Sequence, residues 1–172
     1  MAEYELDAAR ELVVVARDVV DRGLNSAEAR STVAYLSSRS IELTLKAFLE
    51  RAGLPAADLR TLSSRIPALL ERIDTCYIRE EIVPGHRRWV PAKRLRAVTV
   101  SAGDTSSTIG SVLESLSAGR RLALPGLPPR ASPPDPQTIL ATAQALLEWA
   151  EAHWTEVRLH RWSDDTDPDV RA

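Results

Sequence analysis

One stretch of the sequence, REEIVPGH, places an arginine and a histidine seven positions apart, at Arg79 and His86. In a metal-independent endoribonuclease, an imidazole moves the proton of the ribose 2′-hydroxyl while a guanidinium holds the scissile phosphate through its fork of N–H donors. Arg79 and His86 are therefore the candidate catalytic residues. The competing interpretation is chance spacing, because Glu80 and Glu81 adjoin the arginine and would repel a phosphate.

The segment that begins at His86, HRRWVPAKRLR, combines five basic residues with one aromatic ring and contains no acid. Phosphate neutralisation needs the charge and base stacking needs the flat ring, so we expect this segment to contact RNA or a nucleotide. The predicted nucleic-acid-binding residues are Arg87, Arg88, Trp89, Lys93, Arg94 and Arg96. The competing interpretation is a basic loop that is solvated or that pairs with acidic residues of the same or another chain.

The charge of the chain is unevenly distributed. The net charge is −2, yet residues 82–130 hold eight Lys or Arg against two acids, a local charge of +6. The other residues therefore sum to −8. A basic middle on an acidic frame indicates that the middle meets an anionic partner.

Metal and cofactor chemistry have no matching motif in the sequence. Cys76 is the single cysteine, and no Cys/His set has the spacing of a zinc site. A glycine-rich phosphate loop and a GxSxG elbow are also missing. We therefore predict no metal and no cofactor. Since the sequence shows neither a signal peptide nor an apolar run of membrane-spanning length, we expect a cytoplasmic protein without a membrane partner.

Composition and periodicity favour helices as the elements that carry these residues. Ala and Leu are abundant, Gly is scarce and β-branched runs are short. We expect helices over residues 7–24, 26–52, a segment within 58–73, 105–117 and 136–162, the last starting from the strong signal Asp135-Pro136. The predicted fold class is all-α, an up-and-down helical bundle of four to five helices.

The remaining segments are predicted to interrupt or follow this bundle. Residues 76–103 contain Pro84-Gly85, Pro91 and short β-like runs, which predicts an irregular basic insertion or small hairpin between the third and fourth helices. Residues 118–135 form a Pro-rich loop, and 163–172 a disordered acidic tail. We expect one domain over residues 1–162.

The helix predicted around Tyr35 to Pro55 carries apolar residues on more than one face. Such a helix has neighbours on two sides, and Ser37, Ser38 and Ser40 are small enough for one neighbour to approach closely. Gly53 and Pro55 end it, because glycine accepts a left-handed cap and proline prevents continuation. We therefore expect this helix at the centre of the bundle.

Two parts of the sequence resemble the HEPN domain, a small all-α bundle often tied to RNA or nucleotide biology. The second-helix pattern of a glutamate, a Leu-Lys-Ala step and a closing glycine is matched by Ser40, Glu42, Leu43, Leu45, Lys46, Ala47 and Gly53. The sequence RLALPG at residues 121–126 and the Ala-rich run TILATAQALLEWAEAHW at 138–154 are similar to the loop and final helix of these proteins. The resemblance implies a homodimer and a toxin–antitoxin or phage-defence setting.

Three functions remain open from the sequence. The first is an RNA- or nucleotide-binding module that uses the basic insertion. The second is the metal-independent endoribonuclease that uses Arg79 and His86. The third is a helical adaptor or inhibitory partner protein that makes no nucleic-acid contact.

Overall fold

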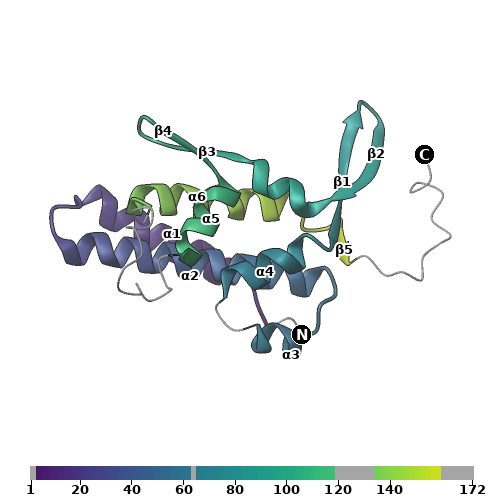
Figure 1. Cartoon of the computed structure of the whole chain (residues 1–172), viewed down its shortest axis with the longest axis horizontal. Helices are drawn as coiled ribbons and strands as arrows, with labels where there is room; N and C mark the ends of the chain where they lie inside the picture. The colour runs from purple at the N-terminus through teal and green to yellow at the C-terminus, as the bar shows by residue number, and fades with distance from the viewer. Residues whose placement is uncertain (1–2, 63–64, 119–133, 160–172) are drawn as a thin grey trace, which may run out of the picture.

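The computed structural model of the chain describes residues 3–62, 65–118 and 134–159. Its elements in order are α1 (Leu6–Asp21), α2 (Ala27–Arg51), α3 (Ala56–Thr61), α4 (Ile66–Ile73), β1 (Cys76–Val83), β2 (His86–Pro91), the 3-10 helix η1 (Ala92–Ala97), β3 (Thr99–Ala102), β4 (Thr105–Thr108), α5 (Ile109–Ala118), α6 (Pro136–Ala152) and β5 (Val157–Leu159) (Figure 1).

Three long helices form the body of the molecule. Helices α2 and α6 run in the same direction, because Arg30 pairs with Asp135 near their starts at 2.9 Å and Phe48 packs on Trp149 near their ends, with ring centroids 4.8 Å apart. Helix α1 runs the opposite way along both. It lies close to α2, since the Ser40 hydroxyl donates to the carbonyl of Ala9 at 2.8 Å.

The central position predicted for the second helix is confirmed. The C-terminal half of α2 is buried around its whole circumference, from Ser40 to Leu49 with Leu43 only partly exposed. Its neighbours include α1, α3, α4, α6 and β5. Burial on every side explains why apolar residues occupy more than one face of its sequence.

Cap residues fix the ends of the long helices as the sequence indicates. Ser26 is the N-cap of α2, and its side chain accepts from the backbone N–H of Ala29 at 3.0 Å. Gly53 follows α2 with φ +105°, the left-handed conformation that glycine tolerates. Asp135 caps α6 by accepting from the N–H of Gln137 at 2.9 Å, with Pro136 as the first helical residue.

The prediction of an all-α fold is wrong: the described chain is mixed α/β. Five strands form two antiparallel sheets, one with the order β2-β1-β5 and one with β3-β4. Residues 76–108, which include the segment predicted as an irregular insertion, contain two hairpins joined by η1. The turns Pro84-Gly85 and Gly103-Asp104 break any helix here, and each hairpin satisfies its backbone groups by strand pairing instead.

The last helix is also shorter than predicted. It ends at Ala152 instead of Trp162, and residues 157–159 pair with β1 as a third strand. The backbone of this segment is held on two sides. The N–H of Arg79 donates to the carbonyl of Glu156 at 3.1 Å, and the N–H of Leu159 donates to the carbonyl of Ala52 at 3.0 Å. These partners come from distant parts of the chain. The pattern of apolar residues within the segment therefore could not predict that it pairs as a strand.

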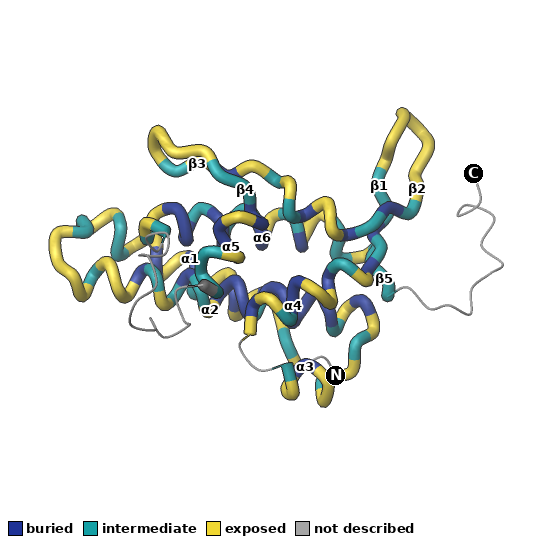
Figure 2. Tube along the Cα trace, in the orientation of Figure 1, coloured by how far each residue is buried: buried dark blue, intermediate teal, exposed yellow. Residues whose placement is uncertain are grey.

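The β-rich segment is part of the core on its inner side. Cys76, Ile78, Val90, Leu95 and Val100 are buried in one hydrophobic cluster with the helices. The tip of the β1–β2 hairpin and much of β3–β4 are exposed (Figure 2). The segment predicted as an irregular insertion thus contributes to the core, because its inner face is apolar.

The Pro-rich loop at 118–135 and the acidic tail at 163–172 lie mostly or wholly outside the described residues. Among the helices that the structure describes, none has the length and apolar character needed to cross a membrane.

Candidate nucleic-acid interface

The three-stranded sheet has two chemically distinct faces, because successive residues of a strand point to opposite sides. One face carries Cys76, Ile78 and Val90, which are buried against the helices. Residues directly opposite in the ladder share a face, so the pairs Tyr77↔Arg158 and Arg79↔Trp89 lie on the other side. We call this side the outer face; it comprises Tyr77, Arg79, Glu81, Arg87, Trp89, Glu156 and Arg158.

A cation–π stack links the two edge strands of the outer face. The Arg158 guanidinium of β5 lies over the indole of Trp89 in β2, 4.1 Å from its centroid. The contact reaches across the central strand β1, and both residues are partly exposed. A guanidinium on an indole presents a flat, positively charged platform of the kind on which nucleic-acid bases stack.

The two acids of the outer face are held by groups beside them. Glu156 forms an ion pair with Arg87 across β1. Glu81 accepts a hydrogen bond from the backbone N–H of Gly85, in the turn of the hairpin, at 2.7 Å. Their charges are therefore partly offset inside the protein, which reduces the repulsion that the sequence predicted between Glu81 and a phosphate.

Arg79 is the cation of this face that lacks an acceptor. Its Nε is buried, and it has no hydrogen-bond partner among the described residues. Arg79 stands on the central strand, with Trp89 opposite it on β2 and Glu156 opposite it on the β5 side. A buried N–H without a partner is unfavourable by about 1–3 kcal/mol. This Nε is enclosed by the protein, so a ligand cannot supply the missing acceptor at that atom.

Arg79 and His86 are not brought together. His86 pairs with Val83 next to the turn, four residues beyond Arg79 along β1. At about 3.3 Å per residue, the two backbones are separated by roughly 13 Å along the hairpin. Because strand pairing holds the two residues apart, this arrangement does not favour their action on one phosphate.

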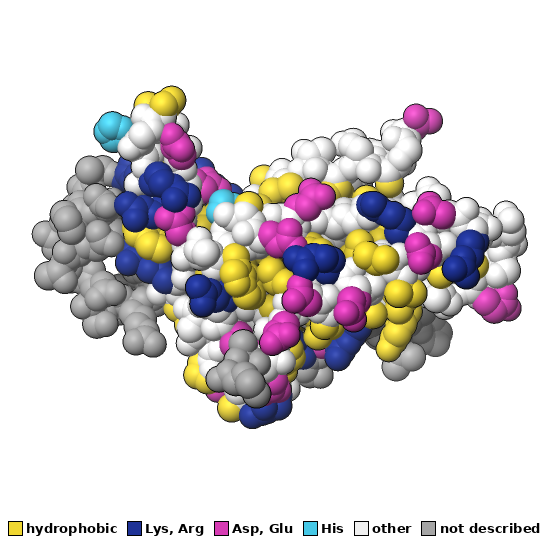
Figure 3. Space-filling model, turned by 180° about the vertical axis from the view of Figure 1, so that it is seen from behind, with side chains coloured by type: hydrophobic (Ala, Val, Ile, Leu, Met, Phe, Trp, Pro, Cys, Tyr) yellow, Lys and Arg dark blue, Asp and Glu magenta, His cyan; other side chains and the backbone are white. Residues whose placement is uncertain are grey.

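The predicted nucleic-acid-binding residues divide into three groups. Arg87 and Trp89 lie on the outer face, and Arg88 points to the opposite side. Arg94 and Arg96 are engaged in ion pairs within the fold, Arg94 with Glu80 at 2.9 Å. Arg88 and Lys93 are exposed, and neither makes an ion pair within the part of the chain that is described. Positive and negative side chains accordingly alternate over the projecting hairpin in Figure 3.

Arg96 has a structural role. Its guanidinium contacts the Asp74 carboxylate through two atoms, Nε at 3.1 Å and Nη2 at 2.8 Å, and Nη1 reaches Glu114 at 3.3 Å. The hydrogen bonds to Asp74 raise the pKa of Arg96. This residue connects η1 to the end of α4 and to α5, so its charge is used to hold elements together.

His153 lies on the core side of the same sheet. Its imidazole packs on Trp149, with centroids 5.0 Å apart, and its Nε2 is 3.9 Å from the Glu80 carboxylate. Burial lowers the pKa of His153, and Glu80 opposes that shift. The group is therefore held mostly neutral near pH 7.

Glu42 and Lys46, which carry part of the HEPN resemblance, form a buried ion pair at 2.8 Å. Arg39 adds a second contact to Glu42 at 2.7 Å, and Lys46 lies 5.3 Å from the centroid of the Tyr4 ring. Each charged group thus has a partner, as buried charges require. The pair stabilises α2 against the start of the chain.

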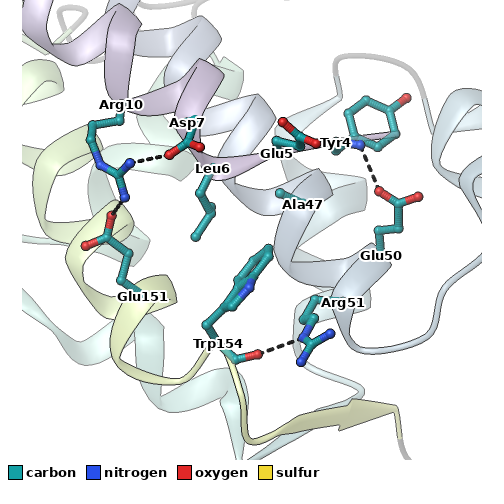
Figure 4. Close-up of a pocket in the computed structure, with 10 residues that line it drawn as sticks. All are labelled: Tyr4, Glu5, Leu6, Asp7, Arg10, Ala47, Glu50, Arg51, Glu151 and Trp154. Atoms are coloured by element: carbon teal, nitrogen blue, oxygen red, sulfur yellow. Dashed lines mark hydrogen bonds and ion pairs between the residues drawn. The ribbon is translucent and has the colours of Figure 1, made fainter. Parts of the chain in front are cut away.

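An open pocket of about 820 Å³ lies where the ends of α1, α2 and α6 meet (Figure 4). Its polar groups bond mainly to the protein itself. Arg10 contacts Asp7 and Glu151, and the Glu50 carboxylate accepts from the backbone N–H groups of Glu3 and Tyr4. Arg51 donates to the carbonyl of Trp154 at 3.0 Å. These contacts hold the ends of the helices together. They leave few polar groups of the pocket free to orient a ligand.

Metal chemistry finds no support in the described ranges, where no three His, Cys, Asp or Glu residues gather as potential ligands. Cys76 is buried, and burial raises the pKa of its thiol to about 12. A thiol that stays protonated is a poor nucleophile and a poor ligand.

Tyr77 and Arg158 are members of the outer face that the sequence did not single out. Arg158 is 62 or more residues from every residue of β2 and η1 that was predicted to bind, and it was assigned to the last helix. The alternation of Val157 and Leu159 around it is the only local signal, and three residues are too few to identify a strand.

Comparisons with known proteins returned no relative: no family model, no curated protein and no solved structure matches the chain. The resemblance to the HEPN domain stays a prediction from the residues quoted above.

Proposed function

We propose that this protein is a binding module for single-stranded RNA and that the outer face of the β2-β1-β5 sheet is its contact surface. The observation that carries the proposal is the stack of the Arg158 guanidinium on Trp89, beside the partly exposed Arg79 on the same sheet face. Aromatic and guanidinium planes hold unstacked bases, and arginine forks hold phosphates. The two chemistries lie together on one sheet face.

Single strands fit this surface better than a duplex does. Bases in a duplex are stacked on one another and cannot lie flat on Trp89, whereas bases of a single strand can splay onto a sheet. The outer face is three strands wide, about 10 Å between its edge strands at about 4.8 Å per step. It therefore suits a short extended segment.

The predicted homodimer and the toxin–antitoxin or phage-defence setting follow from the HEPN resemblance alone. They remain part of the proposal. A module that binds RNA is compatible with either setting, and the adaptor alternative would place the binding function on helix faces instead.

Fluorescence anisotropy with a labelled single-stranded RNA tests the proposal directly. Replacing Trp89 by alanine removes the stacking surface, which is worth about 1–3 kcal/mol per base, so the Kd should rise about fivefold to a hundredfold. His86→Ala serves as the matched control on the same hairpin, because His86 is exposed at the turn, away from the platform. Its Kd should equal that of the unaltered protein.

Two results would contradict the proposal. One is the absence of RNA binding by the unaltered protein at low salt, and the other is equal affinity in the Trp89→Ala variant. If the same RNA were cut without added metal, and His86→Ala abolished the cutting, the endoribonuclease alternative would replace the binding module.

A further inference from the structure

The end of the β1–β2 hairpin is apolar. Ile82, Val83 and Pro84, called here the tip residues, follow one another and are all exposed, Ile82 to 51% and Val83 to 57%. Figure 3 shows hydrophobic side chains at the end of this hairpin, with basic side chains nearer the body. A run of consecutive apolar residues in water is unfavourable unless a partner covers it. The tip residues therefore have a role that the outer face does not explain.

The backbone of the hairpin changes register just before the turn. Glu81 pairs with Arg87 and Val83 with His86, so Ile82 is an extra residue that has no partner on β2. A bulge of this kind bends a strand and re-aims side chains, and such bulges are common beside functional sites. At Gly85 in the turn, no atom beyond the chain neighbours lies within 4 Å of the position that a Cβ would take. The tip is thus an apolar end with open space around it.

Two consecutive arginines stand behind the tip on opposite faces of the hairpin. Arg87 lies on the outer face and Arg88 on the other side, and both are exposed. Arg88 makes no ion pair within the part of the chain that is described, because Glu80, opposite it in the ladder, is paired with Arg94. A single strand that follows the outer face does not contact Arg88, since the two faces point apart. The proposed function therefore leaves this cation unused.

An RNA that divides at the tip would use all of these features. Where a duplex opens into two strands, its last base pair exposes a flat apolar face, and the two strands leave on different sides. Apolar side chains such as Ile and Pro pack against base faces in proteins that insert them between base steps. Arginines neutralise the phosphates of a strand that passes them. The tip residues thus suit the base pair, and Arg87 and Arg88 suit one strand each.

We infer that the β1–β2 hairpin is a wedge that binds the fork of an RNA, the point where a duplex opens into two single strands. The inference rests on the proposed function, because one of the two strands continues along the outer face to Trp89. Trp89 pairs with Arg79, which precedes Val83 by four residues on β1, about 13 Å at about 3.3 Å per residue. The other strand passes Arg88 on the opposite face. The substrate class is then RNA whose single-stranded segment adjoins a duplex.

Anisotropy titrations with two labelled RNAs test the inference. One is a stem with an unpaired tail of about eight nucleotides on each strand at the same end, and the other is a single strand of about sixteen nucleotides. The unaltered protein should bind the fork about fivefold to thirtyfold more tightly, because the tip residues leave water only with the fork. The double variant Ile82→Thr, Val83→Thr should lose this preference and bind the single strand as before. Threonine keeps the β-branched shape that suits a strand.

The matched control changes another adjacent pair of exposed valines. Val14 and Val15 lie on α1 and are 55% and 50% exposed. The double variant Val14→Thr, Val15→Thr should keep the full preference for the fork. Arg88→Gln tests the second strand: it should weaken binding of the fork by about threefold to tenfold and leave the single strand unaffected.

Methyl NMR locates the contact. The signals of Ile82 and Val83 should shift when the forked RNA is added, because the ring currents of the last base pair act on methyl groups that lie against it. The single strand should leave these signals in place, and so should vesicles of phosphatidylcholine and phosphatidylserine. The methyl signals of Val14 and Val15 are the control in each spectrum.

Each result decides a separate point. Equal affinity of the unaltered protein for the two RNAs overturns the inference and leaves the proposed function standing. An equal loss on both RNAs in the tip variant shows that the tip residues only support the hairpin, which also overturns it. Tip signals that respond to the vesicles and not to the fork would assign the tip to a membrane surface instead. If neither RNA binds, the proposed function fails and the wedge fails with it.

Discussion

The two hairpins of this protein share a backbone design and differ in the chemistry that they present. Both are antiparallel ladders closed by a two-residue turn with a left-handed glycine, Gly85 at φ +80° and Gly103 at φ +58°. The β1–β2 hairpin gains a third strand from the far end of the described chain. The β3–β4 hairpin remains two-stranded, and Asp104 is its only charged residue.

This difference shows that the hairpin backbone alone does not make a binding surface. The exposed residues of β3–β4 include Ser101, Thr105 and Ser106, which can donate hydrogen bonds but cannot neutralise a phosphate. On β1–β2, the third strand brings Arg158 over Trp89, and Glu156, the residue just before that strand, pairs with Arg87. The second hairpin is therefore a natural internal control for the first.

The largest effect is expected when the three positive charges of the outer face are removed. The triple variant Arg79→Gln, Arg87→Gln, Arg158→Gln should bind single-stranded RNA at least about thirtyfold more weakly, and the slope of log K against log salt should fall by about 2, at about 0.7 per lost phosphate contact. Anisotropy titrations over a salt series measure both quantities.

The control for the triple variant comes from the other hairpin. Ser101→Ala, Thr105→Ala and Ser106→Ala together should leave the affinity and the salt slope unchanged. Equal losses in the two triple variants would mean that hairpin integrity, and not the charge of the outer face, governs binding. Circular dichroism confirms that each variant is folded before titration.

A smaller effect separates structural arginines from contact arginines within the basic segment. Arg96→Ala removes a two-atom contact to Asp74 and leaves that partly buried carboxylate unpaired. We expect a loss of about 1–2 kcal/mol in the free energy of unfolding, measured by urea denaturation, with RNA affinity unchanged. Arg88→Ala is the matched control and should change stability by less than about 0.5 kcal/mol, since Arg88 is exposed. Equal stability of the two variants would contradict this assignment.

The smallest effect concerns pH and His153. Because burial lowers the folded-state pKa of His153, the unfolded chain takes up a proton first as the pH falls below about 6.5. The stability associated with the neutral imidazole is present above that pH and is lost as the pH falls toward the folded pKa. Glu80 and Glu156 oppose the shift and Arg87 favours it, so the net effect is modest.

Thermal melts at pH 7.5 and 5.5 measure this effect. The melting temperature of the unaltered protein should fall by about 1–2 °C more than that of His153→Gln, whose side chain does not titrate. A larger fall in the glutamine variant would reverse the sign and show that Glu80 dominates. The β3–β4 hairpin has no histidine, so it contributes nothing to the difference.

The helices with strong local signals were predictable from the sequence. Asp135-Pro136 fixes the start of α6, Gly53 ends α2, and the two apolar stripes of α2 place it in the centre. One start signal was misplaced: the helix expected over residues 105–117 begins at Ile109. Thr108 and Ser111 cap it reciprocally, Ser111 N–H to Thr108 Oγ1 at 3.3 Å and Thr108 N–H to Ser111 Oγ at 3.2 Å, and the residues before it form β4.

The three-stranded sheet was not predictable in the same way, because its strands come from distant parts of the sequence and no short segment shows their pairing. Residues of β1 alternate between core and solvent only over Cys76 to Arg79, and its partner β5 is about eighty residues later. Arg87 and Trp89 were identified from composition, whereas Tyr77 and Arg158 join them only through strand pairing. Composition also selected Arg94 and Arg96, whose carboxylate partners lie elsewhere in the sequence.

Strand β5 also determines at which stage of folding the three-stranded outer face is complete. Its pairing with β1 closes a loop of about eighty residues, and such long-range contacts are slow to form because the entropy of loop closure must be overcome first. The β1–β2 ladder is local and can form early, without Arg158. Because the Arg158 guanidinium stacks on Trp89 only when β5 is paired, we expect the stack to form after the local β1–β2 ladder.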